Sequence, residues 1–401
     1  MEAAAPPAGR EPLAIGGGGR PTFGNGREHP VRTLVLMVMV VLFGVSYSIA
    51  GNIRAKVLGK YSGIITTVLN SITYVAVYFP VLWVRRRRGL VSAEQTAWTY
   101  SWRSPYAGCG ESLWSRAGGW KYMFLGGLCD CVSQVLLFTS QAYVSLVAQV
   151  ILHQMNVIYT AVWSITLLGS RYILLEVAGM SLSALGGAVT IISEPAGSSS
   201  PLHLAIFALS AAPPSLVLKE LMFRRWAADA RRGACGVGHT APLDIWCVSS
   251  AAALFQLVWV IPVVALAAGR EKEESETVTG FLLGAWDCLR DAPGSGCTGA
   301  WQSYAIYICF DILANVFIYM LMREGSALLA FVTLKVNVPL TAVLGLIRWP
   351  VVGAARLNAA EVCSLLMVCA GAALFFSGTL KRESLAGRVR RLCCFPAFEP
   401  S

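Results

Sequence analysis

Long apolar runs separated by short polar segments dominate the chain. A run of about 18–25 residues is the length at which an α-helix crosses the hydrocarbon core of a bilayer. The sequence therefore predicts an all-α polytopic membrane protein with ten transmembrane helices, at 33–51, 62–84, 119–141, 144–168, 172–193, 202–222, 243–268, 300–322, 326–346 and 358–380. Pro213, Pro214 and Pro339 fall inside these spans. We expect them to kink or unwind their helices, which is tolerated where neighbouring groups satisfy the freed backbone.

The polar residues inside the spans repeat. A shift of 181 residues places several polar or aromatic positions on matching ones: Trp120 on Trp301, Asp130 on Asp311, Gln134 on Asn315 and Asn156 on Asn337. Each half, 33–193 and 202–380, then holds five spans. Five is odd, so the second half must enter the membrane from the opposite face. Two inverted five-helix repeats are typical of secondary transporters that bind solute near the midplane and work by alternating access.

Composition narrows the class of protein. Of the 401 residues, 56% are hydrophobic and 13% are charged, whereas soluble domains carry about 45–50% and about 25%. A soluble enzyme, a nucleic-acid module and a disordered scaffold are thereby excluded. The sequence offers no catalytic constellation, and its four histidines are scattered. We therefore expect no enzyme activity, no cofactor and no metal site.

The distribution of basic residues predicts the orientation. If both termini are cytosolic, 22 Lys and Arg residues lie on the cytosolic side and eight on the other side. Basic residues concentrate in cytosolic loops, so we expect cytosolic termini and no nucleic-acid partner. Residues 1–32 are read as a disordered tail and 381–401 as a C-terminal tail. The loop 269–299 is the largest non-cytosolic segment.

Two aspartates are the first candidates for the transport site. Asp130 and Asp311 lie in the middle of apolar spans, where an aspartate costs about 2.5–3.5 kcal/mol to insert. Such residues usually face the interior of a bundle and mark an ion or substrate path. Coupling to protons is one hypothesis for them. The alternative is a structural hydrogen bond to Gln134 or Asn315, one helical turn away.

The fourth and ninth spans carry the second group of candidates. Gln149, His153 and Asn156 have the spacing of one helical face, and Lys335 and Asn337 occupy the repeat-related stretch. We expect these two helices to line a central cavity; the alternative is that the polar side chains join neighbouring helices. Lys335 is expected either to neutralise one of the aspartates or to bind an anionic group of the substrate.

Several stretches resemble a known family. They are Asn52-Ile53-Arg54-Ala55-Lys56, Thr73 to Phe79, Ile151-Leu152-His153-Gln154, Leu167 to Tyr172, and Cys297-Thr298-Gly299-Ala300-Trp301. In this order they resemble the chloroquine-resistance-transporter-like proteins of the drug/metabolite transporter superfamily. The resemblance implies a vacuolar or plastid-envelope carrier of amino acids, short peptides, glutathione-type thiols or basic drugs, acting as a monomer or weak dimer. Phosphate-exporting relatives that use lysines make an anion exchanger for phosphate or nucleotide sugars the alternative, and a channel is a further one.

The resemblance also points to particular residues. The position of the first helix that governs drug export in the parasite proteins falls near Ser48. Cys288 and Cys297 match the outer pair of loop disulfides in those proteins, and the turn residues between them would let them meet; two free thiols are the alternative. From their own context, Cys393 and Cys394 follow basic residues just past the last span, which suits S-palmitoylation.

Overall fold

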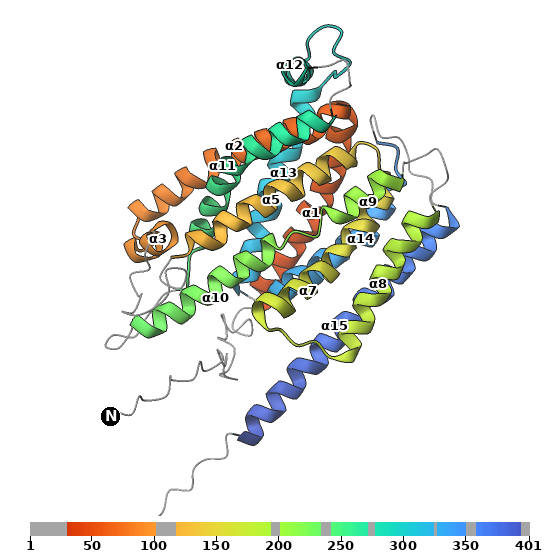
Figure 1. Ribbon diagram of the computed structural model, residues 1–401. Coiled ribbons are helices and arrows are strands. Elements are labelled where there is room, and N and C mark those ends of the chain that lie inside the picture. The colour runs from red at the N-terminus through yellow and green to blue at the C-terminus, as the bar shows by residue number, and fades with distance from the viewer. Residues whose placement is uncertain are drawn as a thin grey trace, which may run out of the picture.

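The chain folds as a bundle of helices (Figure 1). A computed structural model describes residues 30–101, 118–193, 201–233, 242–271, 277–324, 327–349 and 358–393. Within these ranges the chain forms no β-strand. Seven stretches are long and apolar enough to cross a membrane: Val31–Arg87, Trp120–Gln141, Leu146–Leu168, Leu174–Ser193, Ile245–Gly269, Ala300–Leu321 and Ala359–Gly378. The all-α, multi-pass class is therefore confirmed.

The helices follow the predicted spans in order. The first half comprises α1 (Pro30–Leu58), η1 (Gly59–Tyr61), α2 (Ser62–Arg87), α3 (Ala93–Tyr100), α5 (Trp120–Gln141), α6 (Leu146–Leu152), η2 (His153–Met155), α7 (Asn156–Leu168) and α8 (Leu174–Ser193). The second half comprises α9 (Pro201–Leu209), α10 (Ser215–Gly233), α11 (Ile245–Glu271), α12 (Val278–Leu289), α13 (Ala300–Glu324), α14 (Ala327–Gly345) and α15 (Ala359–Cys393).

The outer face of the bundle is apolar. Leu174, Ile192 and Leu266 expose 85%, 83% and 79% of their surface. Large aliphatic side chains exposed to this extent are rare over a broad area of a soluble monomer, whereas lipid tails solvate them well. Buried polar residues such as Asn52, Arg54 and Asn70 lie on the inner faces instead. The bundle thus turns its hydrocarbon surface outward and its polar groups inward, as a bilayer requires.

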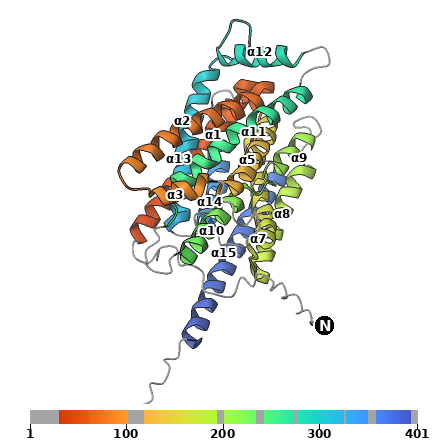
Figure 2. The ribbon, with the colours of Figure 1, turned by 60° about the vertical axis from the view of Figure 1, so that its left-hand side comes forward.

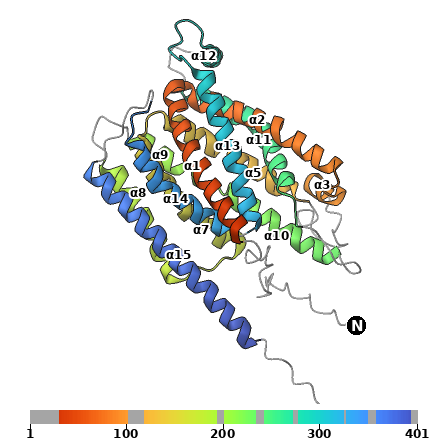
Figure 3. The ribbon, with the colours of Figure 1, turned by 180° about the vertical axis from the view of Figure 1, so that it is seen from behind.

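Close backbone contact joins α8 to α15, which lie side by side (Figures 1 and 3). A Cβ built on Gly179 would lie 2.5 Å from the carbonyl oxygen of Gly371, and one built on Gly371 would lie 2.6 Å from that of Gly179. A Cβ on Gly186 would lie 2.8 Å from the carbonyl oxygen of Ser364. Small residues let transmembrane helices approach this closely and gain dispersion contacts.

The Pro213–Pro214 pair breaks the sixth predicted span into α9 and α10. The carbonyl groups freed at the break have side-chain donors: Ser133 of α5 donates to the Ser210 carbonyl, and Trp163 of α7 donates to that of Ala212 at 2.7 Å. Neighbouring helices thus satisfy the backbone that proline releases, which is the condition for irregular backbone at membrane depth. By contrast, α14 continues through Pro339 without interruption.

Several predicted spans differ from the helices. Helices α10 and α15 continue past their predicted ends, to Gly233 and Cys393. The first helix does not end at residue 51 but continues to Leu58, because the polar residues that suggested an end, Asn52 and Arg54, are buried against other helices. The fourth span is not one α-helix, since the 3-10 turn η2 separates α6 from α7. This turn changes the direction of the side chains that follow it.

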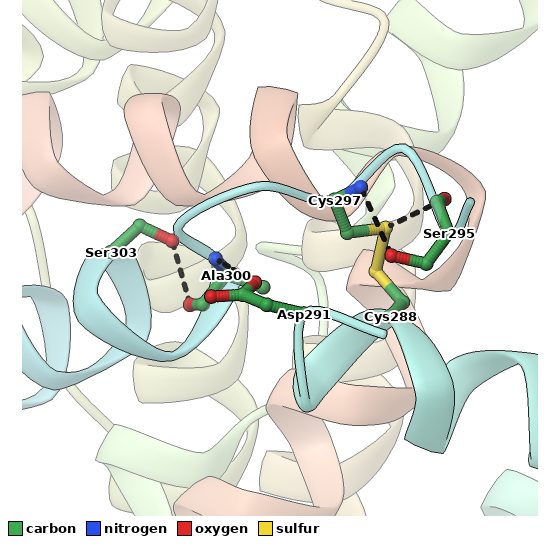
Figure 4. The surroundings of a disulfide bond; sticks show 6 residues. All are labelled: Cys288, Asp291, Ser295, Cys297, Ala300 and Ser303. Carbon is green, nitrogen blue, oxygen red and sulfur yellow. Dashed lines mark hydrogen bonds between the residues drawn. A yellow bond between two sulfur atoms is a disulfide. The ribbon is translucent and has the colours of Figure 1, made fainter. Parts of the chain in front are cut away.

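Helix α12 lies across the end of the bundle opposite to the C-terminal end of α15 (Figure 2). A disulfide joins Cys288, in its last turn, to Cys297 (Figure 4). Both cysteines are buried in a cluster with Leu58 and Ile65 of α1 and α2. The backbone N–H of Ala300 donates to Asp291 Oδ1 at 3.0 Å, so the segment after α12 leads directly into α13.

Replacing Gly371 with alanine should destabilise the α8–α15 pair. Its Cβ would meet the Gly179 carbonyl of the facing helix, and overpacking of this kind costs about 1–3 kcal/mol. We expect a lower midpoint of thermal unfolding for the purified Gly371→Ala protein. Gly126→Ala is the matched control, because its nearest neighbour would lie at 3.7 Å, an ordinary contact. An equal effect of both substitutions would contradict this account of the helix pair.

Candidate functional site

A polar cavity of about 160 Å³ lies inside the bundle. Six helices line it: α1, α2, α5, α10, α11 and α13. The lining residues are Tyr47, Tyr74, Tyr78, Asp130, Gln134, Leu137, Phe138, Lys219, Ser249, Ala252, Ala253, Gln256, Tyr307, Asp311, Asn315 and Tyr319. An apolar cavity of similar volume holds a molecule the size of benzene, so this one has room for a solute about as large as an amino acid.

Asp130 and Lys219 form an ion pair in the cavity wall. Lys219 Nζ lies 2.9 Å from Asp130 Oδ2, and the two side chains are 8% and 15% exposed, respectively. Asp130 belongs to α5 and Lys219 to α10, so the pair ties the broken sixth span to the third. A buried charge without its partner is strongly unfavourable, and each residue therefore explains why the other is tolerated inside the bundle.

Asp311 has a different environment. Its carboxylate accepts hydrogen bonds from the hydroxyl of Tyr74 on α2 and from Asn315 Nδ2, the latter at 3.2 Å. The residue is 5% exposed, and no salt bridge to it is found among the described residues. Of the two repeat-related aspartates, Asp130 is thus neutralised by a lysine, whereas Asp311 is held by neutral donors. The predicted hydrogen bond to Asn315, one turn away, is present.

Gln134 also lies at the cavity, as expected. Its Oε1 accepts from Gln256 Nε2 of α11 at 2.8 Å. The two helices come close enough for this bond because Gly127 of α5 carries no Cβ; one built there would lie 2.6 Å from the backbone of Phe255 and Gln256. Asp130, Gln134, Asp311 and Asn315 are the predicted residues that the structure brings together around one space.

The described side chains of the fourth and ninth predicted spans are not among the residues that line this cavity. Gln149 is buried and donates to the carbonyls of Gln141 and Val144 at 2.9 Å. His153 is exposed, and Asn156 accepts from Thr160 on its own helix at 3.0 Å. The i, i+4, i+7 spacing assumes one continuous α-helix, whereas the 3-10 turn η2 lies between Gln149 and Asn156.

Other predicted residues also lie away from the cavity. Ser48 donates to the Gly44 carbonyl on its own helix, and its neighbour Tyr47 lines the cavity instead. Asn337 packs against Gly44 and belongs to the contact between α1 and α14. Lys335 lies in α14, but its side chain is outside the described part of the chain, as are the side chain of Cys393 and the whole of Cys394.

Sequence reasoning missed Lys219, the cation of the site. The predicted span 202–222 includes this lysine, three residues before its end. The cost of placing a lysine inside the bilayer is the signal that identifies it. The tyrosines were missed for another reason: aromatic residues are common in apolar helices, and only the fold shows that Tyr74 points its hydroxyl at Asp311.

A bundle of apolar helices around charged side chains defines the class as a multi-pass membrane protein. Comparison with known proteins agrees. The family model described as CRT-like, chloroquine-resistance transporter-like, matches residues 115–375. The chain belongs to this family.

Three relatives illustrate the similarity. Protein CLT2, chloroplastic, of Arabidopsis thaliana is 26% identical over 282 residues, which cover 68% of this chain and 59% of the relative. Protein CLT1, chloroplastic, of the same plant is 22% identical over 353 residues, covering 85% and 72%. The chloroquine resistance transporter of Toxoplasma gondii is 24% identical over 286 residues, covering 64% and 30%. The chain thus spans less than two thirds of the length of the first and third of these relatives.

A double-mutant cycle will measure the ion pair at the cavity. Asp130→Asn or Lys219→Gln alone leaves one buried charge unpaired, which costs about 3–5 kcal/mol, and we expect each to lower the thermal midpoint strongly. The combined substitution leaves no charge and should recover a large part of that loss.

The exposed pair of Asp287 and Arg290, with side chains 49% and 55% exposed, is the matched control. A pair of this kind contributes about 0–1 kcal/mol. Strictly additive effects at Asp130 and Lys219 would show that the two groups do not interact.

Proposed function

We propose that the protein is a secondary active transporter that moves small organic solutes across an organelle membrane by alternating access. The solutes are amino acids, short peptides or glutathione-type thiols, with basic drugs as further cargo. The observation that carries this proposal is the cavity of about 160 Å³ at which Asp130, Lys219 and Asp311 meet inside the bundle. Its volume favours solutes the size of an amino acid, and a tripeptide requires that the helices move apart.

Two inverted repeats are supported by the pairing of helices. Each of the ten predicted spans contains one helix or a broken pair of helices. The repeat relates α5 to α13 and α8 to α15. Accordingly, α8 packs against α15, its counterpart in the other half. In the same way, α1 packs against α13, and the corresponding helices α9 and α10 pack against α5. The two aspartates at the cavity are repeat-related as well.

Alternating access is supported by a difference between the two halves. Helix α5 packs extensively against α2 and α11, whereas its repeat mate α13 makes far fewer contacts with the same two helices. In an inverted-repeat transporter, exchanging the conformations of the two repeats converts one end state into the other. A movement of α13 toward α2 and α11, matched by a movement of α5 away from them, would expose the cavity to the opposite side.

The charges at the cavity favour a zwitterion or a cation over a multiply charged anion. The described lining holds two carboxylates and one ammonium group, so its sum is negative. A phosphate or nucleotide-sugar exchanger would place its anion against Asp311. We therefore rank the anion exchanger below the carrier of amino acids and peptides.

The relatives and the charges support a proposal for the location and the orientation. Two of the relatives named above are described as chloroplastic, which favours a plastid envelope over a vacuole. The excess of basic residues favours cytosolic termini. In that orientation α12 and the Cys288–Cys297 disulfide lie on the non-cytosolic side.

Reconstitution tests the function. The purified full-length chain in proteoliposomes should accumulate at least one of radiolabelled leucine, alanyl-alanine and glutathione, and unlabelled solute on the opposite side should accelerate the uptake. Saturable counterflow of this kind is expected of a carrier. Single-channel conductance without counterflow would instead show that the protein is a channel. Absence of uptake for all three solutes would overturn the proposal.

Asp311 is the proposed coupling site for protons. It faces the cavity without a salt bridge among the described residues, so its charge is free to be neutralised by a proton or by the amine of a solute. We expect Asp311→Asn to abolish the response of uptake to a pH gradient. Exchange at equal pH should become slower, because the substitution also removes the charge that the amine of a solute would meet. Asp287→Asn, on α12 outside the cavity, is the control and should retain the response. An unchanged gradient dependence in Asp311→Asn would exclude this residue as the coupling site.

A further inference from the structure

Arg54 is a fully buried cation immediately behind the cavity wall. The residue is 0% exposed. Its guanidinium Cζ lies 4.4 Å from the ring centroid of Phe138 on α5 and 3.9 Å from that of Tyr307 on α13. Both rings line the cavity, so the two aromatic side chains separate the guanidinium from the solute space. Such stacking on ring faces partly replaces the lost hydration of the cation.

The hydrogen bonding of Arg54 is incomplete. Its Nη2 donates to Gln141 Oε1 at 2.6 Å, whereas Nε and Nη1 are buried with no acceptor among the described residues. A buried donor without a partner costs about 1–3 kcal/mol, and more when it is charged. The surroundings nevertheless accommodate this group, because Gly51, on the preceding turn of α1, leaves room for the Gln141 side chain. A Cβ built on Gly51 would lie only 3.1 Å from Gln141 Nε2.

The unused donors have a defined geometry. In a guanidinium group, Nη2 shares one edge with Nε and the other edge with Nη1. A carboxylate that displaces Gln141 from Nη2 therefore gains a two-point contact on either edge, the arrangement in which arginine binds carboxylates most strongly. Phe138 and Tyr307 belong to α5 and α13, the repeat-related helices whose movement the proposed transport cycle requires, so that movement also uncovers Arg54.

We propose that Arg54 is the subsite that receives the carboxylate of the transported solute while Asp311 receives its amine. The inference rests on the proposed function and deepens it, since it assigns the substrate to zwitterions with a free carboxylate. Tyr307, against which Arg54 stacks, lies four residues before Asp311 on α13, a rise of about 6 Å along the helix. The two charged groups thus flank the same tyrosine.

The balance of charge supports a zwitterion. The described cavity residues Asp130, Asp311 and Lys219 sum to one negative charge, and Arg54 brings the total to zero. A solute with one ammonium and one carboxylate group leaves the site neutral and gives each free charge a partner. Inorganic phosphate would satisfy Arg54 but leave Asp311 facing a further negative charge.

The test compares solutes that differ only in the carboxylate. Leucine and alanyl-alanine are each titrated against the purified full-length chain beside the corresponding carboxamide. Glutathione, which has two carboxylates, is titrated beside the amide of its glycine carboxylate, and thermal stabilisation is measured. We expect at least one acid to stabilise the protein at a concentration about tenfold or more below that of its amide, the factor that a hydrogen bond to a charged group contributes. Equal potency of every acid and amide, or stabilisation by inorganic phosphate alone, would overturn the assignment without requiring any variant to fold.

Variants then locate the effect. Arg54→Gln should remove the preference for the acid over the amide, and Arg54→Lys, which keeps the charge but loses the planar fork, should retain only part of it. Lys56→Gln is the matched control, because Lys56 is a cation on the same helix that donates to the Ala142 carbonyl, away from Phe138 and Tyr307; it should keep the full preference.

A full preference in Arg54→Gln would overturn the assignment to this residue. The outcomes for the two proposals stay distinct. Uptake that persists while the acid and its amide compete equally overturns the Arg54 subsite alone, whereas absence of uptake for all solutes overturns the proposed function.

Discussion

Charge inside a hydrocarbon-coated bundle is the constraint on which the rest of the structure depends. Asp130, Asp311, Lys219 and Arg54 lie inside or directly behind one cavity, and each is tolerable only while another group offsets its desolvation. Asp130 and Lys219 offset each other by direct contact. Asp311 relies on the neutral donors Tyr74 and Asn315, and Arg54 relies on two aromatic faces and one amide. These charges bring α1, α5, α10 and α13 together, and the apolar contacts among the other helices build the frame around them.

The two aspartates at the cavity have different surroundings. Asp130 of α5 has a direct cationic partner, whereas Asp311 of α13 has none among the described side chains. The difference arises from the helices beside them, since α10 supplies Lys219 to Asp130 whereas α1 supplies Arg54, which stacks on Tyr307. One carboxylate is thus neutralised by an ion pair, and the other is held by the neutral donors Tyr74 and Asn315.

The fold class was predictable because apolar length is read directly from the chain, and the aspartates were predictable because an acid at mid-membrane is costly. The positions of polar residues were harder to predict, because a polar residue can mark either the end of a helix or a site buried against another helix. Arg54 and Asn52 suggested the end of a helix that in fact continues to Leu58. Gln149, His153 and Asn156 suggested one helical face because the 3-10 turn at His153–Met155 has no marker such as proline or glycine. The periodicity of a sequence describes one helix at a time, whereas the burial of these residues depends on contacts between helices.

The break at Pro213–Pro214 has a mechanical consequence. Both pieces pack against α5, but α9 also packs against α6 and α8, whereas α10 also packs against α7. Since Ser133 and Trp163 already hold the carbonyls at the break, bending there need not rupture a helical hydrogen bond. The sixth predicted span can therefore bend at Pro213–Pro214. The bend lets α10, which carries Lys219, tilt while α9 keeps its contacts with α6 and α8.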